Sequence, residues 1–186
     1  MLTIIIPVLD QAAMLDASLR ALQPLRERGH EVLVVDGGSR DGSVTIARKH
    51  ADRVILSGSG RALQMNAGSE SASHDILLFL PVTTLLPARA DELIIEAVQQ
   101  KSAVWGFFRM SFANAGLWTR LQTAISNWRG MASLSQAIFV HRHAFERVKG
   151  FDNLSVNEDM ALCRKLRTIG NPERIASLAS HAPANK

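Results

Sequence analysis

Short segments dominated by Val, Ile, Leu and Phe recur along the first half of the chain and are separated by amphipathic stretches. These apolar segments are Leu2–Val8, Val32–Val35, Arg53–Leu56 and Asp75–Leu80. A strand that is apolar at consecutive positions is buried on both faces, as in a parallel sheet covered by helices. The pattern therefore predicts four parallel strands of an α/β fold.

The intervening stretches carry apolar residues at the three- and four-residue spacing that produces one helix face. After the first strand this face is formed by Met14, Leu15, Leu19, Leu22 and Leu25. Asp10 is placed to cap this helix, and Asp41 to cap the next one, which runs to about His50. Two more helices are expected over Arg61–Ser73 and Ala88–Gln100.

Beyond residue 101, strands and helices alternate less regularly. We expect strands over Ala103–Phe112 and Gln136–Val140, and helices over Leu117–Met131, Ala144–Lys149 and Val156–Ile169. Residues 171–186 have little pattern and are predicted to form a loose tail. The elements together predict a single α/β domain over residues 1–186, with a mostly parallel central sheet and helices on both faces.

Composition narrows the choice of ligand and compartment. The chain has 186 residues, 47% of them hydrophobic, which suffices for one domain with a core. Its net charge of +4 suits a phosphate-bearing ligand, an anionic membrane surface or nucleic acid alike. The Lys and Arg residues are scattered and form no basic block, so we expect no nucleic acid. Cys163 is the single cysteine, interpreted as a small buried hydrophobe, and it can form no internal disulfide.

Targeting signals do not appear in the sequence. The first strand lacks a basic segment and a cleavage site, so we expect no secretory signal. No apolar run reaches the roughly 20 residues of a membrane helix. We therefore expect a cytoplasmic protein, and the positive charge leaves open a peripheral association with the inner membrane face.

The segment that follows the second strand carries the strongest functional signal. The strand Val32–Val35 ends in Asp36, Gly37 and Gly38. Ligands of open α/β sheets bind outside the carboxyl ends of the strands. The loop at Asp36 is therefore expected to contact a nucleotide. The glycine fingerprint of dehydrogenases is absent after the first strand, and so is a P-loop, which argues against both classes.

Several segments, taken in order, resemble family 2 glycosyltransferases with the GT-A fold. They are Leu2–Asp10, Val34–Ser43, Gly60–Gly68, Asp75–Leu80, Gln136–Phe151 and the pair Glu158-Asp159. Gly60–Gly68 resembles the G-R-A-x-Q-M-N-A-G segment of small bacterial members. The resemblance extends from Leu2 to about Gly170. It implies a nucleotide-binding half over residues 1–101 and an acceptor-side half over 102–170. It also implies transfer of a sugar from a nucleoside-diphosphate donor to an acceptor hydroxyl, with inversion at the anomeric carbon.

The resemblance also implies roles for individual residues. The nucleotide site would comprise Pro7, Asp10, Asp36, Gly37, Arg61, Gln64 and Asn66. Asp36 would accept a hydrogen bond from the base or ribose, and Arg61 at a helix start would attract the diphosphate. Glu158 and Asp159 match the acidic pair of the family, in which one carboxylate is the general base.

Gln136 and Trp105 are candidates for the acceptor site.

Each of these assignments also has a simpler structural interpretation. Asp36 is also a common turn residue, Arg61 a common solvated helix residue, and acidic residues favour helix N-termini electrostatically. Gln136 is also an ordinary strand-start residue, and a tryptophan such as Trp105 more often belongs to a core than to a sugar site.

One position departs from the family in a way that bears on the cofactor. Where the family carries a metal-binding acid after the fourth strand, this chain has Thr83. A hydroxyl is a weak ligand for Mn²⁺ or Mg²⁺, which prefer carboxylates and phosphates, so binding of a divalent cation is expected to be weak. A second acid, near the acceptor site, is also missing before Gln136.

Three hypotheses follow from the sequence. The first is a glycosyltransferase with weak metal dependence. The second is a catalytically degenerate module of the same fold that binds a nucleotide or nucleotide-sugar. The third is a nucleotidyltransferase, which would need a glycine-rich basic loop after the first strand, where this chain has Pro7–Met14. The sequence does not identify the sugar, the acceptor, the base or the oligomeric state.

Overall fold

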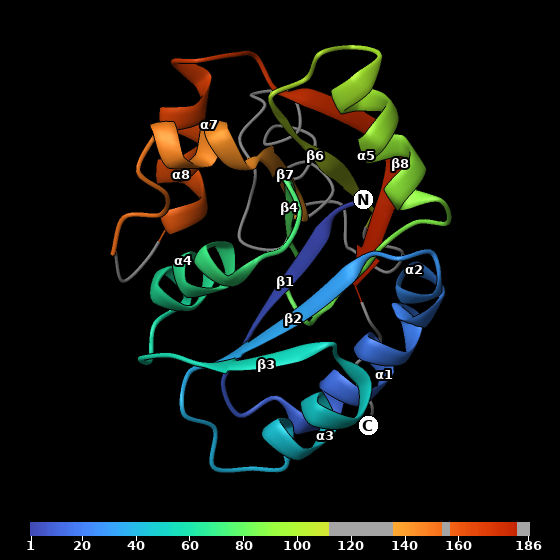
Figure 1. The fold of residues 1–186 in the computed structure, drawn as a ribbon, viewed down its shortest axis with the longest axis vertical. Coiled ribbons are helices and arrows are strands. Elements are labelled where there is room, and N and C mark those ends of the chain that lie inside the picture. The colour runs from blue at the N-terminus through green and yellow to red at the C-terminus, as the bar shows by residue number, and fades with distance from the viewer. Residues whose placement is uncertain (112–135, 154–156, 182–186) are drawn as a thin grey trace, which may run out of the picture.

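Eight strands within the described residues, 1–111, 136–153 and 157–181, form one sheet in this computed structural model (Figure 1). Their bounds are β1 Thr3–Val8, β2 Glu31–Asp36, β3 Arg53–Leu56, β4 Ile76–Phe79, β5 Thr84–Leu85, β6 Trp105–Ser111, β7 Ile138–His141 and β8 Glu173–His181. The spatial order is β3-β2-β1-β4-β7-β6-β8-β5. The helix expected over Leu117–Met131 lies outside the described residues.

Pairing is parallel in the first half of the chain and mixed in the second. β1 pairs parallel with β2 and β4, and β2 pairs parallel with β3. β7 runs antiparallel to both β4 and β6, while β8 is parallel to β6 and antiparallel to β5. The predicted mostly parallel α/β sheet is therefore confirmed, with antiparallel strands added on the side of β7.

Helices cover both faces of the sheet (Figure 1). Their bounds are α1 Ala12–Ala21, α2 Gln23–Glu27, α3 Ser43–His50, α4 Arg61–Ser71, α5 Ala90–Gln99, α7 Arg142–Arg147 and α8 Glu158–Arg167. Ile4 and Ile6 of β1 pack into a core beneath α1, α2 and α5, while Ile5 packs into a second core with residues of α4, α7 and α8. Burial on both faces explains why β1 is apolar at consecutive positions.

The second core contains the single cysteine and several aromatic rings. Cys163 on α8 is 1% exposed, as expected for a small buried hydrophobe. Phe79 on β4 contacts Phe145 and Phe151, with ring centroids 5.1 and 4.9 Å apart. These contacts hold α7 and the segment after it against the sheet.

The prediction of a loose tail over residues 171–186 is wrong for Glu173–His181, which forms β8. This strand pairs with β6 through the register Gly106↔Glu173 and Phe108↔Ile175, and its far end pairs with β5. Strand pairing across such a sequence separation depends on the partner strand, so the local pattern of residues 171–186 does not reveal it. Residues 182–186 lie outside the described part of the chain.

Candidate active site

The carboxyl end of β1, the segment after β4 and the start of α4 surround a cleft of about 340 Å³. Its lining residues are Pro7, Leu9, Gln11, Ser59, Gly60, Arg61, Gln64, Pro81, Val82 and Thr83. The chain passes from β1 to β2 and β3 on one side and then crosses back to β4 on the other side of β1, so the strand order reverses at β1. A crevice at this kind of switch point is the usual ligand site of an open α/β sheet.

Close packing of α4 on the sheet sets the floor of this cleft. A Cβ atom at Gly68 would overlap Cγ2 of Ile5 and lie 3.0 Å from Cγ2 of Val35, so glycine is required for this approach. One turn earlier, Nε2 of Gln64 donates hydrogen bonds to the carbonyl oxygens of Val8 (2.7 Å) and Val35 (2.8 Å). Gln64 therefore lines the cleft and also joins the ends of β1 and β2.

Asp36 ends β2 with its carboxylate almost fully buried, at 2% exposure. Its Oδ2 accepts hydrogen bonds from the backbone N–H groups of Gly38 and Ser39, each 2.9 Å long. Gly38 adopts a φ of +97°, which favours glycine. Oδ1 of Asp36 is buried and has no hydrogen-bond partner among the described residues. A buried carboxylate oxygen without a donor is costly, so this atom is suited to accept a hydrogen bond from a ligand.

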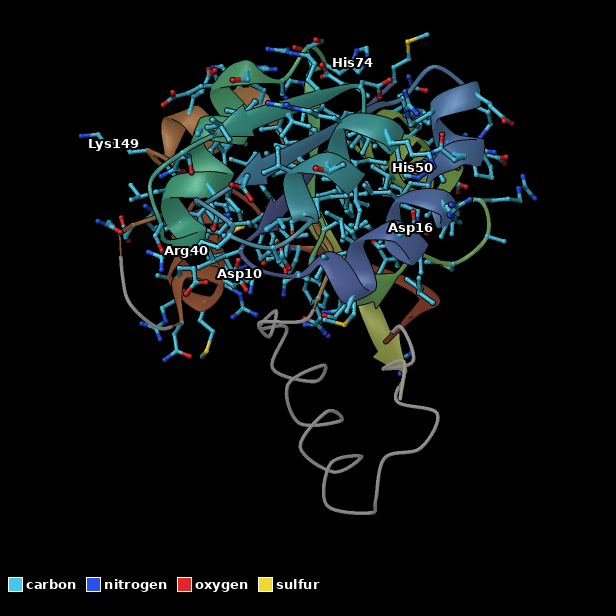
Figure 2. The ribbon with its side chains drawn as sticks, turned by 90° about the horizontal axis from the view of Figure 1, so that it is seen from below. Asp10, Asp16, Arg40, His50, His74 and Lys149 are labelled. Carbon is cyan, nitrogen blue, oxygen red and sulfur yellow. The ribbon has the colours of Figure 1, made fainter. Side chains whose placement is uncertain are left out.

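The loops after β1 and β2 are tied to each other by side-chain hydrogen bonds. The backbone N–H of Arg40 donates to Oδ1 of Asp10 (2.7 Å), and the N–H of Asp10 donates to Oγ of Ser39 (2.9 Å). Figure 2 shows Asp10 and Arg40 side by side on the surface. Asp10, with a φ of +51°, was expected to cap a helix, but it instead fixes the Asp36 loop.

The expected cap at Asp41 contacts two helix starts rather than one. Its Oδ1 accepts from the N–H of Ser43 at the start of α3, and its Oδ2 accepts from the N–H of Ala12 at the start of α1. Gly42, not Asp41, occupies the N-cap position of α3. Asp41 thus connects the starts of α1 and α3 beside the site.

The acidic pair stands at the start of α8, where Asn157 adopts a φ of +66° just before the helix. Glu158 and Asp159 are buried, with exposures of 5% and 1%. Nη2 of Arg61 lies 3.2 Å from Oδ2 of Asp159, and Nε of Arg61 lies 3.7 Å from Oε1 of Glu158. Arg61 therefore joins the cleft, which it lines, to the acidic pair.

Asp159 is a stronger base than an ordinary aspartate. Burial is the main cause that raises the pKa of Asp159 to about 6, while Arg61 opposes the rise and the carboxylate of Glu158 adds to it. Oδ2 of Asp159 is buried and, although it faces Arg61, makes no hydrogen bond with the described residues. At pH 7 the group is ionised and has an oxygen able to accept a proton from a hydroxyl.

Asn66, which the resemblance assigns to the nucleotide site, lies away from the cleft. The amide of Asn66 pairs with the backbone of Phe151 through both its Nδ2 (2.9 Å) and its Oδ1 (3.0 Å), so it fastens α4 to the segment after α7. Asn66 lines a different pocket, beside Arg142. Its position on α4, two residues after Gln64, places it on another side of the helix.

The two acceptor candidates are both buried. Trp105 is 0% exposed and its Nε1 donates to the carbonyl oxygen of Gly170 (2.8 Å), so its ring offers no face to a sugar. The assignment of Trp105 to an acceptor platform is therefore wrong in this structure. Gln136 is 1% exposed, close to the start of β7. Burial does not exclude a role in the site, since Asp36 and Asp159 are about equally buried, so the assignment of Gln136 to the acceptor site stays a prediction.

The residues at the cleft do not fit a hard divalent cation. None of the residues that line it carries a carboxylate or an imidazole, and Thr83 lines it where the resemblance led us to expect an acid. Among the described residues, no group of three or more His, Cys, Asp and Glu could hold a metal ion. Mn²⁺ and Mg²⁺ prefer oxygen ligands of carboxylates and phosphates, so this protein supplies poor ligands to either ion.

Sequence reasoning missed part of the lining. Ser59 and Gly60, which precede α4, were not among the residues assigned to the site, yet both line the cleft. Gln11 also lines it, from just before α1. The signal for Ser59 and Gly60 was available, because a loop that follows a parallel strand and precedes a helix lies at the ligand-binding edge of the sheet.

Comparison with known proteins places the chain in a family. The sequence model of glycosyl transferase family 2 matches residues 3–158. This chain belongs to glycosyl transferase family 2. No curated protein matches its sequence. Among the described residues of this family member, no helix is long and apolar enough to cross a bilayer.

Solved structures show the same fold at low identity. The mannosyltransferase PcManGT from Pyrobaculum calidifontis, in complex with GDP-Man and Mn²⁺, is 21% identical, with a TM-score of 0.72 over 98% of this chain and 56% of its own. TarS of S. aureus is 17% identical, with a TM-score of 0.73 over 97% and 36%. Glucosyl-3-phosphoglycerate synthase from Mycobacterium tuberculosis is 14% identical, with a TM-score of 0.72 over 98% and 70%.

These likenesses show that the fold is that of GT-A glycosyltransferases. The chain spans about half the length of PcManGT and about a third of that of TarS. The conserved geometry of a fold does not itself identify a reaction, which depends on the residues of the site.

Proposed function

We propose that this member of the family transfers a sugar from a nucleoside-diphosphate donor to an acceptor hydroxyl, with inversion at the anomeric carbon. The observation that carries the proposal is the position of Arg61, which lines the cleft and contacts both Glu158 and Asp159. One guanidinium thus lies between a site for an anionic donor and a buried carboxylate suited to act as a base.

The nucleoside end of the donor is assigned to the loop at Asp36. Oδ1 of Asp36 has no hydrogen-bond donor within the described part of the chain, and a ribose hydroxyl or a base N–H would satisfy it. Pro7 and Gln64 line the adjoining cleft. The diphosphate is assigned to the side of Arg61, where a guanidinium can donate two parallel hydrogen bonds to phosphate oxygens. Solved relatives of the fold hold GDP-Man or UDP, which supports this kind of donor.

In the proposed reaction Asp159 is the general base. The acceptor hydroxyl gives its proton to the Asp159 carboxylate, and its oxygen forms a bond to the anomeric carbon of the donor. On the opposite side, the bond between that carbon and the diphosphate oxygen breaks, and the electron pair leaves with the nucleoside diphosphate. Attack and departure on opposite sides invert the configuration. Glu158 is assigned to the electrostatics of the base, because its carboxylate contributes to the raised pKa of Asp159.

The proposal is tested by titrating UDP, GDP and their sugar conjugates into the protein by calorimetry and then measuring release of the diphosphate with water or sugar alcohols as acceptors. At least one donor should bind, and Asp36→Asn should weaken its binding about tenfold, since a charged acceptor of a buried hydrogen bond is lost. Asp16→Asn, which changes an exposed carboxylate on α1, is the matched control. Absence of binding by every donor would refute the donor site.

Stereochemistry and the base require separate measurements. From a donor whose sugar is α-linked, the product should be β-linked by NMR, and an α-linked product would contradict inversion. Asp159→Asn should leave donor binding within about threefold and lower the transfer rate by 10²-fold or more, as expected for loss of a general base. Equal transfer rates in Asp159→Asn and the unmodified protein would remove Asp159 from this role.

A second candidate function is a binding module that has lost turnover. It is favoured by Thr83, which lines the cleft where the resemblance to the family predicts an acid. This module would bind a nucleoside diphosphate but release none from a nucleotide-sugar. Recovery of Mn²⁺-dependent turnover by Thr83→Asp would support the module, whereas turnover by the unmodified chain would exclude it.

A further inference from the structure

We propose that this protein binds the diphosphate of its donor without a divalent cation, and that the guanidinium of Arg61 supplies the positive charge that the cation supplies elsewhere. The inference rests on the proposed donor site. It concerns how that site neutralises its ligand, which the family match and the solved relatives leave open.

The set of ligand atoms at the cleft is the first argument. Mg²⁺ is usually held by one or two carboxylates together with substrate phosphates, so a single carboxylate would be the minimum. The polar side chains that line the cleft are Gln11, Ser59, Arg61, Gln64 and Thr83, none of which is a carboxylate. Nε2 of Gln64 already donates to two backbone carbonyls. The minimum for a cation site is not met.

The rest of the chain does not supply the missing acid. All 17 Asp and Glu residues lie within the described residues, since the segments 112–135, 154–156 and 182–186 contain none. Asp36 uses Oδ2 for two backbone N–H groups, and Asp10 uses Oδ1 for that of Arg40. Neither Asp10 nor Asp36 lines the cleft. The carboxylates of this protein are therefore engaged or placed elsewhere.

Arg61 also contacts both carboxylates of the acidic pair, Glu158 and Asp159, which lie beside the cleft. A cation bound to Glu158 and Asp159 would have to displace a guanidinium that lies 3.2 Å from Oδ2 of Asp159. Two like charges cannot share that space without a large repulsion in a buried site. The acidic pair is thus a partner for Arg61 and not a vacant metal site.

The geometry of Arg61 suits a group that changes partners. Its contacts to the acids, at 3.2 and 3.7 Å, are longer than the 2.7 Å contact between Arg28 and Asp91. A diphosphate oxygen can therefore compete with these two carboxylates for the guanidinium of Arg61. The first turn of α4, which Arg61 begins, contains no acidic residue, so the partial positive charge of the helix start adds to that of the guanidinium.

The experiment is calorimetric titration of UDP and of GDP into the protein, first in EDTA and then in about 5 mM MnCl₂. Even a weakly held divalent ion binds at this concentration. For the diphosphate that binds, the dissociation constants in the two buffers should agree within about threefold. Arg61→Gln should weaken binding about tenfold or more in EDTA, and Arg61→Lys should weaken it less, since a charge without the planar fork remains. Arg20→Gln, which removes an exposed guanidinium of α1, should change nothing.

A gain-of-function variant completes the test. Thr83→Asp adds one carboxylate to the cleft, so Mn²⁺ should tighten binding by this variant and not by the unmodified protein. Tightening of tenfold or more by Mn²⁺ in the unmodified protein would overturn the inference while leaving the donor site intact. Failure of both diphosphates in both buffers would overturn the donor site and this inference together. The comparison of buffers needs no variant, so it stands even if Arg61→Gln fails to fold.

Discussion

Replacement of Asp159 by asparagine should stabilise this protein at neutral pH while it removes the proposed base. The pKa of Asp159 is raised from 3.8 to about 6, chiefly by burial. Each pKa unit corresponds to about 1.4 kcal/mol, so the ionised carboxylate costs about 3 kcal/mol of folding free energy at pH 8. This cost already includes the attraction of Arg61, because the raised pKa is the net result.

The sign of the effect follows from proton binding. Between about pH 4 and pH 6 the unfolded chain releases the proton of Asp159 before the folded protein does, so the free energy of unfolding falls as the pH rises. Asparagine has no charge at any pH. The variant should therefore match the unmodified protein near pH 4 and exceed it by up to about 3 kcal/mol at pH 8.

Urea unfolding of both proteins at pH 4.5 and pH 8, followed by circular dichroism, measures this difference, because titrations common to both proteins cancel. Asp152→Asn changes an exposed carboxylate that pairs with Lys165 and should shift stability by no more than about 0.5 kcal/mol at either pH. If Asp159→Asn were instead less stable than the unmodified protein at pH 8, the attraction of Arg61 would outweigh burial. The assignment of a raised pKa to Asp159 would then be refuted.

Three further predictions use other parts of the structure. The acid limb of the pH profile of kcat/KM should lie near pH 6, where Asp159 becomes protonated, and a limb near pH 4 would argue against this base. Gly68→Ala should lower the free energy of unfolding by about 1–3 kcal/mol, since its Cβ would overlap Ile5, and an unchanged urea midpoint would contradict that packing. Burial opposes ionisation of Asp91, but its hydrogen bond with Arg28 helps to lower the pKa of Asp91 to about 2. The ionised carboxylate should therefore add about 2 kcal/mol to the free energy of unfolding above pH 4. Thermal unfolding of Asp91→Asn should show a loss of stability that shrinks as the pH falls towards 2.

The sequence was sufficient for the parts of the fold that local periodicity determines. β1 and β2 were predicted because buried parallel strands are apolar at consecutive positions, and their ends then located the ligand edge of the sheet. Asp36 was expected at that edge and lies there, buried at the end of β2. Arg61 was expected to begin a helix and is the first residue of α4. The resemblance put the acidic pair at a helix start, and α8 begins with this pair, two residues after the predicted start at Val156.

Contacts between distant segments were beyond local reasoning. Asn66 lies in the segment whose resemblance to the family implied a nucleotide-site role, yet its amide is engaged by the backbone of Phe151, 85 residues later. Trp105 lies fully in the core because β6 is covered on that face, which depends on α8 and not on the residues around Trp105. β8 forms because β6 offers it a partner. In each case the deciding interaction joins residues far apart in the sequence, so the local pattern around either residue does not reveal it.

The burial of Cys163 provides a means of observing motion in the helix that bears the acids. It is the only cysteine of the chain, is 1% exposed, and lies one turn after Asp159 on α8. A thiol reagent can therefore react only in conformations in which α8 has opened, so the labelling rate in native buffer reports the free energy of that local opening. The natural protein already carries this single reporter, and a donor that binds Arg61, which contacts the acids at the start of α8, should slow its labelling.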